Sequence, residues 1–207
     1  MPASPAAPVT GNFCDKQAVR HPLERRAVAR FDRRLAALVA ARAPGRVLEI
    51  GCGEGHVAGL VRAVLPGCRY VAADIDPALL ELARQRGADE TVLLDPAAPT
   101  RLARPDRSFD LVLLVEVLEH VADPRGMLAE AARLGRSVIA TVPFEPWWRL
   151  LNLLRLRYVA RLGNTPGHVN HWGRRGFAQL LAGCPGSAEV RSVFPWLVAA
   201  VEVRGDG

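Results

Sequence analysis

Short apolar runs alternate with amphipathic segments over the first two thirds of the chain. The apolar, β-favouring runs predict strands, and the amphipathic segments, which end at Gly or Pro, predict helices. The predicted strands are 46–50, 69–74, 91–94, 109–115 and 137–142, and the predicted helices are 23–41, 55–64, 78–86 and 127–134. Strands that alternate with helices pair in parallel through right-handed crossovers. The pattern therefore predicts a doubly wound, Rossmann-like α/β sheet, with ligands bound beyond the carboxyl ends of its strands.

The pattern changes after Pro143. An apolar stretch with interspersed arginines covers 147–162, a helix is predicted at 174–182, and two strands at 188–194 and 197–203 predict a hairpin joined at Pro195. We find no internal repeat and no linker. We therefore expect a flexible N-terminal tail at 1–11 and a single domain over 12–207, which carries a helical cap insert at about 144–173.

Composition narrows the class of protein. The chain has 207 residues, of which 50% are hydrophobic and 23% charged, which suits one domain with a sizeable core. No apolar run is long enough for a signal peptide or a membrane span, so we expect a cytoplasmic protein. The four cysteines are far apart and show no CxxC spacing, which predicts free thiols and no metal site.

The net charge of +6 raises the question of a nucleic-acid partner. Lys16 is the only lysine, and the arginines are spread along the chain rather than grouped. Without an RNA-binding motif, such a dispersed charge is weak evidence for a nucleic-acid interface. We expect a small-molecule substrate and no nucleic-acid partner.

The glycine-rich turn after the first strand is the main cofactor signal. It reads Glu49-Ile50-Gly51-Cys52-Gly53-Glu54-Gly55, with glycines that allow a sharp turn and a close backbone approach. His56 replaces the third glycine of a dinucleotide fingerprint, and no Gly-Lys-Ser/Thr ending of a P-loop is present. The acidic residues disfavour a pyrophosphate but suit the sulfonium and ammonium of S-adenosylmethionine.

Two further carboxylates end the neighbouring strands. Asp74 ends the second strand, where it can accept hydrogen bonds from both ribose hydroxyls, and Asp95 ends the third strand, within reach of an adenine amino group. Asp95 precedes Pro96, and this pair is also ordinary turn chemistry. With Glu49, these carboxylates predict one acidic crevice at the edge of the sheet.

This ordered set of motifs resembles class I S-adenosylmethionine-dependent methyltransferases, and within them the small bacterial ubiquinone-methyltransferase-like group. The resemblance covers about residues 12–203 and rests on 47–55, 73–76, 109–112 and 116–121. It implies a seven-stranded sheet with the last strand antiparallel. The cofactor-binding residues that it implies are Glu49, Gly51, Gly53, Asp74, Ile75, Asp95, Pro96, Glu116 and, in an N-terminal segment at 12–16, Lys16.

Three histidines are candidates for a general base at the acceptor side. They are His120 after the fourth strand, and His168 and His171 in the insert. A histidine with a pKa near neutrality can take a proton from an oxygen or nitrogen acceptor. Each of the three also has a structural interpretation as a loop-ordering residue, so the sequence assigns no base.

The insert allows three interpretations. Trp147, Leu150, Leu151, Leu154, Tyr158 and Leu162 are expected to share one helical face, with arginines elsewhere. This face can cap an apolar substrate pocket, pack on the core or on a second subunit of a homodimer, or make peripheral membrane contact through 147–162. The sequence thus predicts a methyltransferase for an apolar or aromatic small molecule, acting at oxygen. The alternatives are a membrane-surface lipid or quinone methyltransferase and a non-methylating protein that binds the same cofactor, as a partner subunit or a cyclase.

Overall fold

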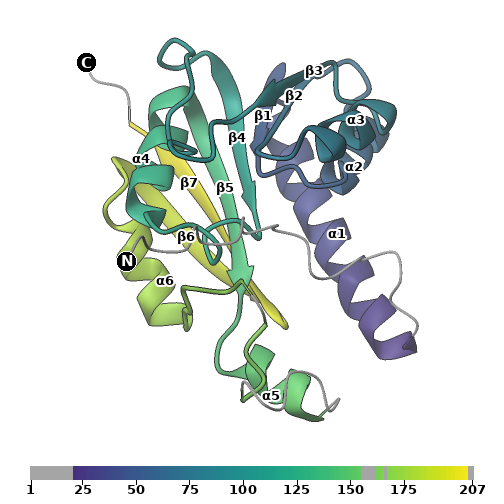
Figure 1. Ribbon diagram of the computed structural model, residues 1–207, viewed down its shortest axis with the longest axis vertical. Coiled ribbons are helices and arrows are strands. Elements are labelled where there is room, and N and C mark those ends of the chain that lie inside the picture. Colours follow the sequence, from purple (N-terminus) through teal and green to yellow (C-terminus); the bar gives the residue numbers. More distant parts are fainter. Residues whose placement is uncertain (1–20, 155–161, 166, 205–207) are drawn as a thin grey trace, which may run out of the picture.

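One mixed sheet of seven strands, in the order β3-β2-β1-β4-β5-β7-β6, forms the centre of the computed structural model, which describes residues 21–154, 162–165 and 167–204 (Figure 1). The strands are β1 (Arg46–Ile50), β2 (Arg69–Asp74), β3 (Glu90–Leu93), β4 (Phe109–Val115), β5 (Gly135–Pro143), β6 (Gly186–Val193) and β7 (Trp196–Val203). β1 to β5 pair in parallel, and β7 is antiparallel to both β5 and β6. The predicted seven-stranded sheet with an antiparallel last strand is confirmed.

Helices cover both faces of this sheet. They are α1 (Pro22–Arg42), α2 (His56–Val64), α3 (Pro77–Gln85), α4 (Pro124–Leu134), α5 (Trp147–Leu154) and α6 (Arg174–Leu181). α1, α2 and α3 lie on one side of the sheet and α4 and α6 on the other (Figure 1). Alternate residues of β1 serve the two layers, since Val47 packs in the core with α1 to α3 and Leu48 in the core with α4 and α6.

The strand register aligns the carboxyl ends of β1, β2 and β4, which form the predicted ligand-binding edge. Leu48 of β1 pairs with Val71 of β2 and with Val112 of β4, so the three strands end at the same side of the sheet. Element boundaries differ from the prediction by one or two residues at most ends, as is usual at frayed termini. β3, for example, begins at Glu90 because it pairs there with Val71.

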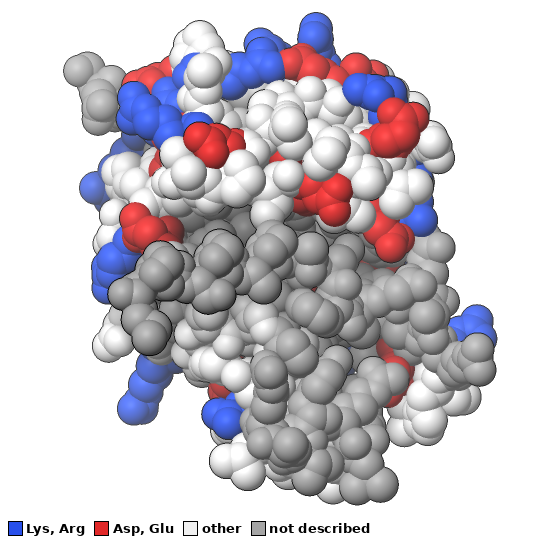
Figure 2. Space-filling view, viewed as in Figure 1, with Lys and Arg blue, Asp and Glu red and all other residues white. Residues whose placement is uncertain are grey.

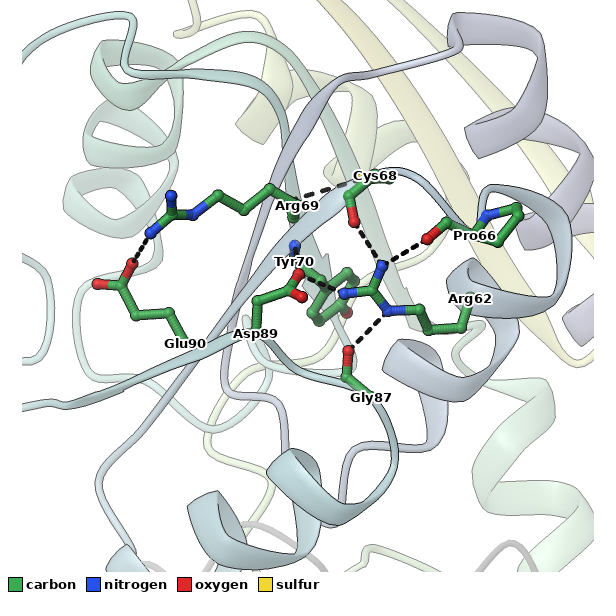
Figure 3. Close-up of polar contacts among 8 residues, drawn as sticks. All are labelled: Arg62, Pro66, Cys68, Arg69, Tyr70, Gly87, Asp89 and Glu90. Atoms are coloured by element: carbon green, nitrogen blue, oxygen red, sulfur yellow. Dashed lines mark hydrogen bonds and ion pairs between the residues drawn. The ribbon is translucent and has the colours of Figure 1, made fainter.

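Arg62 on α2 binds the chain segments that precede β2 and β3, at the edge of the sheet opposite the predicted ligand-binding edge (Figure 3). The guanidinium of Arg62 donates to the carbonyl oxygens of Pro66, Cys68 and Gly87 at 2.6–2.9 Å, and it pairs with Asp89. Burial acts to raise the pKa of Asp89, but the backbone N–H of Tyr70 and the Arg62 guanidinium outweigh it and lower that pKa. This cluster fixes where β2 and β3 begin.

The insert after β5 differs from the prediction. Within the described residues α5 covers Trp147–Leu154, and Leu162 lies in a turn at φ 49° rather than on a helical face shared with Trp147, so that part of the expected face is wrong. Leu154 is 73% exposed, whereas the polar Asn152 is buried and donates to the carbonyl of Gly163. The helix is therefore attached through the polar Asn152 and through Trp148, which packs against the core, while Trp147, Leu150 and Leu154 are exposed.

Some sequence predictions fall outside the described residues. They concern the tail at 1–11, the segment 12–16 with Lys16, and Tyr158 with the arginines at 155, 157 and 161. The boundaries given for the domain and the tail stay predictions. The described cysteines, Cys52, Cys68 and Cys184, are free thiols, as predicted.

Charged side chains of both signs lie next to one another on the face shown in Figure 2. Several arginines are paired with carboxylates, such as Arg69 and Arg104 with Glu90 and Arg133 with Glu130. Within the described part of the chain, no helix combines the length and the apolar character that a membrane crossing requires.

Candidate active site

The glycine-rich turn folds over the end of the neighbouring strand. The backbone N–H groups of Gly51 and Cys52 both donate to the carbonyl oxygen of Ala73 in β2, at 2.7 and 3.1 Å. Gly51, Gly53 and Gly55 have φ values of 75°, 51° and 80°. L-residues with side chains rarely adopt this conformation, so the backbone explains the glycine spacing.

Packing adds a second reason for two of these glycines. A Cβ atom on Gly51 would lie 2.5 Å from Cγ2 of Val117, and one on Gly55 would lie 2.5 Å from the Cα of Ala83. The turn therefore lies directly against the chain after β4 and against α3. This close packing, together with the predicted approach of a ligand, explains why positions 51 and 55 are glycines.

Asp74 connects the glycine turn with the start of α3. Its side chain is almost buried at the end of β2; Oδ2 accepts the N–H of Gly53 at 2.9 Å, and Oδ1 accepts the N–H of Asp76 at 3.1 Å. Each carboxylate oxygen has a second lone pair. Backbone N–H groups thus fix the orientation of the Asp74 carboxylate. Its two oxygens can each accept one more hydrogen bond, for example from the two ribose hydroxyls of the cofactor.

Asp95 and Pro96 are exposed at the end of the third strand, and Ile75 is half-buried after the second. Oδ1 of Asp95 accepts the N–H of Ala97 at 2.8 Å, which forms a local turn. This arrangement matches the turn interpretation of the Asp-Pro pair. Contacts of Asp95, Pro96 and Ile75 with an adenine ring stay predictions.

Glu49 is buried within β1, with 1% of its surface exposed. The hydroxyl of Tyr70 in β2 donates to its Oε2 at 2.7 Å. Burial, reinforced by the nearby Glu49, raises the pKa of Tyr70 well above its ordinary value, so the phenol keeps its proton and stays a donor. Tyr70 was missed in the sequence because a tyrosine inside an apolar strand pattern is indistinguishable from a core residue.

Glu116 directly follows β4 and has a positive φ of 56°. Its backbone N–H donates to both the carbonyl and the hydroxyl oxygen of Thr141 at 3.2 and 3.1 Å, and its Oε1 accepts the indole N–H of Trp196 at 2.7 Å. Such a backbone conformation in a residue with a side chain is uncommon and concentrates at functional sites. Trp196 and Thr141 were not predicted, since nothing in their spacing pairs them with Glu116.

The structure brings the three predicted histidines close together. The ring centroids of His120 and His168 are 4.9 Å apart and those of His168 and His171 are 6.4 Å apart. His120 Nδ1 lies 3.1 Å from the carbonyl oxygen of Gly167, and His171 Nε2 lies 2.7 Å from Oδ1 of Asn164. A carbonyl oxygen only accepts, so Nδ1 of His120 carries the proton and its Nε2 keeps a lone pair.

Burial keeps these imidazoles neutral. It lowers the pKa of His120, and burial together with the neighbouring His120 lowers the pKa of His168 to about 4. The pKa of His171 is also lowered, by burial and by Arg149. Near neutral pH the three rings are therefore proton acceptors or ligands rather than cations.

The loop that carries His168 is bound to the turn after β4 by backbone hydrogen bonds. The carbonyl oxygen of Glu119 accepts the N–H groups of Val169 and Asn170 at 2.9 and 3.2 Å. The side-chain amide of Asn170 donates to the carbonyl oxygens of Leu118 and Val121 at 3.1 and 2.7 Å. Sequence reasoning missed Glu119 and Asn170, because the contact joins segments about 50 residues apart.

The sequence also matches a model of a known protein family. A family model described as a methyltransferase domain matches residues 20–183, which is most of the chain. The chain belongs to the S-adenosylmethionine-dependent methyltransferase family. Its cofactor is S-adenosylmethionine, as predicted, and the binding of that cofactor at the glycine turn and Asp74 stays a prediction.

Individual relatives agree with this assignment. The methyltransferase is 31% identical over 137 residues to the ubiquinone biosynthesis O-methyltransferase of Xanthomonas oryzae pv. oryzae (strain PXO99A), covering 63% of this chain and 56% of the relative. An enzyme of the same name from Xanthomonas campestris pv. campestris (strain B100) is 32% identical over 144 residues, with 65% of this chain and 59% of the relative covered. The chain thus spans less than two thirds of the length of these curated relatives.

Solved structures support the fold. The PH0226 protein from Pyrococcus horikoshii OT3 superimposes with a TM-score of 0.63 at 18% identity, covering 93% of this chain and 95% of that one. Human N-acetylserotonin methyltransferase, solved in complex with the cofactor, gives a TM-score of 0.63 at 16% identity, with 88% and 56% covered. At these identities the comparison establishes the class I methyltransferase fold.

Proposed function

We propose that this methyltransferase transfers the methyl group of S-adenosylmethionine to an oxygen atom of an apolar or aromatic small molecule. The observation that carries the proposal is the neutral imidazole of His120 on the turn after β4, which packs against His168 on the loop bound to that turn. Nε2 of His120 has a lone pair available to a hydroxyl group. A phenolic or enolic acceptor becomes a strong nucleophile when such a group takes its proton.

The proposed reaction is an in-line displacement. The acceptor oxygen forms a bond to the methyl carbon, and the carbon–sulfur bond breaks with its electron pair passing to sulfur, which leaves S-adenosylhomocysteine. The hydroxyl proton moves to an imidazole. The relatives from Xanthomonas are named as O-methyltransferases, which also supports an oxygen acceptor here.

The direct test uses cofactor labelled with ¹³C in the methyl group and a panel of apolar phenols, amines and thiols. We expect a new O-methyl resonance with phenols, and a lower rate constant in the variants His120→Ala and His168→Ala without a matching change in cofactor affinity. Transfer to nitrogen alone would contradict the proposed acceptor. Tight cofactor binding without transfer to any member of the panel would favour the non-methylating alternative.

A second candidate is a membrane-surface methyltransferase with a lipid-like acceptor. The supporting observation is the group of apolar side chains exposed on and around the insert: Trp147, Leu150, Leu154, Leu162, Val169 and Phe194. Trp147 and Phe194 also pack against each other, with ring centroids 6.3 Å apart. Exposed aromatic and aliphatic side chains beside arginines are typical of surfaces that bind at a lipid interface.

Flotation with phosphatidylglycerol vesicles tests this candidate. We expect the wild-type chain to float with the vesicles and Leu154→Asp to stay in solution. The matched control is Leu82→Asp, which adds the same charge at another exposed leucine on α3. Absence of wild-type binding, or equal loss in both variants, would contradict a membrane role of the insert and leave its apolar face for a substrate cap or a second subunit.

A further inference from the structure

A small hollow beside the last strand of the sheet is lined mostly by arginines. It lies between α1 and the edge strand β6, has a volume of about 290 Å³, and is lined by Arg30, Arg34, Arg191, Ser192 and Val193. We propose that this hollow binds a phosphate group, carried by a soluble phosphate ester or diphosphate or by a lipid headgroup. It shares no residue with the glycine turn or with the three histidines, so the proposal does not depend on the identity of the methyl acceptor.

The geometry of one helix and one strand brings the three guanidinium groups to this place. Arg30 and Arg34 are four residues apart on α1, so they lie one above the other on the same face of the helix. Val193 of β6 is buried in the same core as Phe31 of α1. Alternate residues of a strand share a face, so Arg191 lies on the side of α1 as well. The sequence suggested dispersed arginines because Arg191 is far along the chain from the other two.

The hollow has an excess of positive charge. Nε of Arg191 donates to Oε1 of Glu189 at 2.6 Å. This hydrogen bond lowers the pKa of Glu189, and the nearby charge of Arg34 lowers it further. Among the described residues, no carboxylate lies within ion-pair distance of Arg30 or Arg34. Three guanidinium groups against one carboxylate leave two positive charges, which a phosphate dianion balances.

The donors in the hollow suit phosphate oxygens. Arg191 uses only Nε in its hydrogen bond to Glu189, so its two terminal nitrogens keep four N–H donors. A guanidinium group can hold two oxygens of one phosphate at once, and three such groups can share the oxygens of one anion. β6 is the last strand of the sheet, so every second backbone N–H of β6 points away from β7 and adds to the donors at this edge.

The size of the hollow favours a phosphate that is attached to a larger group. A water molecule takes up about 30 Å³ in the liquid, so a volume of about 290 Å³ holds more than one phosphate. Val193 supplies a buried apolar wall on which the first atoms of the attached group can pack. The hollow therefore fits a phosphate ester or diphosphate better than an isolated phosphate ion.

The test is a calorimetric titration of the whole chain with pyrophosphate, in chloride buffer at physiological ionic strength. We expect one saturable site per chain. Arg191→Gln, and the double variant Arg30→Gln with Arg34→Gln, should each weaken binding by about 10-fold, since a hydrogen bond to a charged group contributes at least this factor. Glu189→Gln removes the opposing charge and should tighten binding several-fold.

The matched control is Arg33→Gln, which removes the same charge from an exposed arginine of α1 outside the hollow. It should bind pyrophosphate as the wild type does. Equal weakening in Arg33→Gln and Arg191→Gln would reveal a general attraction of anions to a basic chain and would overturn the proposal, as would the lack of saturable binding by the wild type. Displacement of pyrophosphate by saturating S-adenosylmethionine would place the anion at the glycine turn, and would overturn it too.

Thermal unfolding provides a second measurement. Arg30 and Arg34 repel each other, since like charges four residues apart on a helix are destabilising, and a bound anion offsets this repulsion. Pyrophosphate should therefore raise the Tm of the wild type more than that of Arg191→Gln, because a ligand stabilises only the folded chain that binds it. An equal rise in both would contradict the site.

Phosphatidylglycerol vesicles distinguish the two sources of the phosphate. If vesicles displace pyrophosphate from the wild type, the hollow binds the phosphate of a lipid headgroup. If pyrophosphate binding is the same with and without vesicles, the ligand is a soluble phosphate ester or diphosphate.

Discussion

The indole N–H of Trp196 donates a 2.7 Å hydrogen bond to Oε1 of Glu116, and so joins the first residue of β7 to the turn after β4. Glu116 has a strained, positive φ, and its backbone N–H is held by Thr141. The antiparallel strand that completes the sheet therefore orients a side chain at the predicted cofactor edge. Its contribution to the site goes beyond packing.

The variant Trp196→Phe should separate the hydrogen bond from the packing. The phenyl ring retains much of the contact with Phe31 and Trp148, whose ring centroids lie 4.8 and 5.7 Å from that of Trp196. Loss of a buried donor should lower the free energy of unfolding by about 1–3 kcal/mol and weaken S-adenosylmethionine binding. Urea unfolding and calorimetry measure the two effects. Wild-type cofactor affinity in this variant would show that Glu116 does not need this orientation.

Asp74→Ala tests the ribose contact. Losing a charge-assisted, two-point contact should weaken cofactor binding by about 2–3 kcal/mol, measured by calorimetry. The control Glu81→Gln alters an exposed carboxylate on α3 and should leave the affinity unchanged. If Asp74→Ala binds the cofactor as tightly as the wild type while remaining folded, the ribose is held elsewhere.

The order of the elements and the cofactor edge were readable from the sequence because both depend on local patterns. Apolar runs gave the strands, and the parallel pairing of β1 and β2 then placed the glycine turn beside Asp74. The same logic made His120 a candidate, since it lies in the turn after β4.

Contacts between distant segments were not readable. The bond from Trp196 to Glu116 spans 80 positions, and the approach of His168 to His120 depends on how the loop after α5 returns to the sheet. Helical periodicity also placed Leu162 on one helical face with Trp147, whereas the structure has Leu162 in a turn. It gave no sign that the polar Asn152 would be buried against that turn.

Tyr70→Phe tests how Glu49 is held inside the sheet. Removing the hydroxyl deprives a nearly fully buried carboxylate of a 2.7 Å hydrogen bond, which should lower the free energy of unfolding by about 1–3 kcal/mol. A double-mutant cycle with Glu49→Gln isolates this pair, because both partners are altered separately and together. A coupling energy near zero in urea unfolding would mean that the hydroxyl contributes nothing to holding Glu49.

Gly51→Ala should destabilise the methyltransferase for two separable reasons. The φ of 75° costs a residue with a side chain about 1–2 kcal/mol, and the new Cβ would lie 2.5 Å from Cγ2 of Val117. Val117→Ala removes the side chain that the new Cβ would meet. In that background Gly51→Ala should therefore lose less stability than in the wild type, and the loss that remains should be the cost of the positive φ. The control Gly67→Ala, where a Cβ meets nothing within 4 Å, should change stability by less than about 0.5 kcal/mol. The contrary outcome is that Gly51→Ala costs the same stability in the wild-type background as in the Val117→Ala background. In that case the turn moves away from Val117, and the positive φ alone requires the glycine.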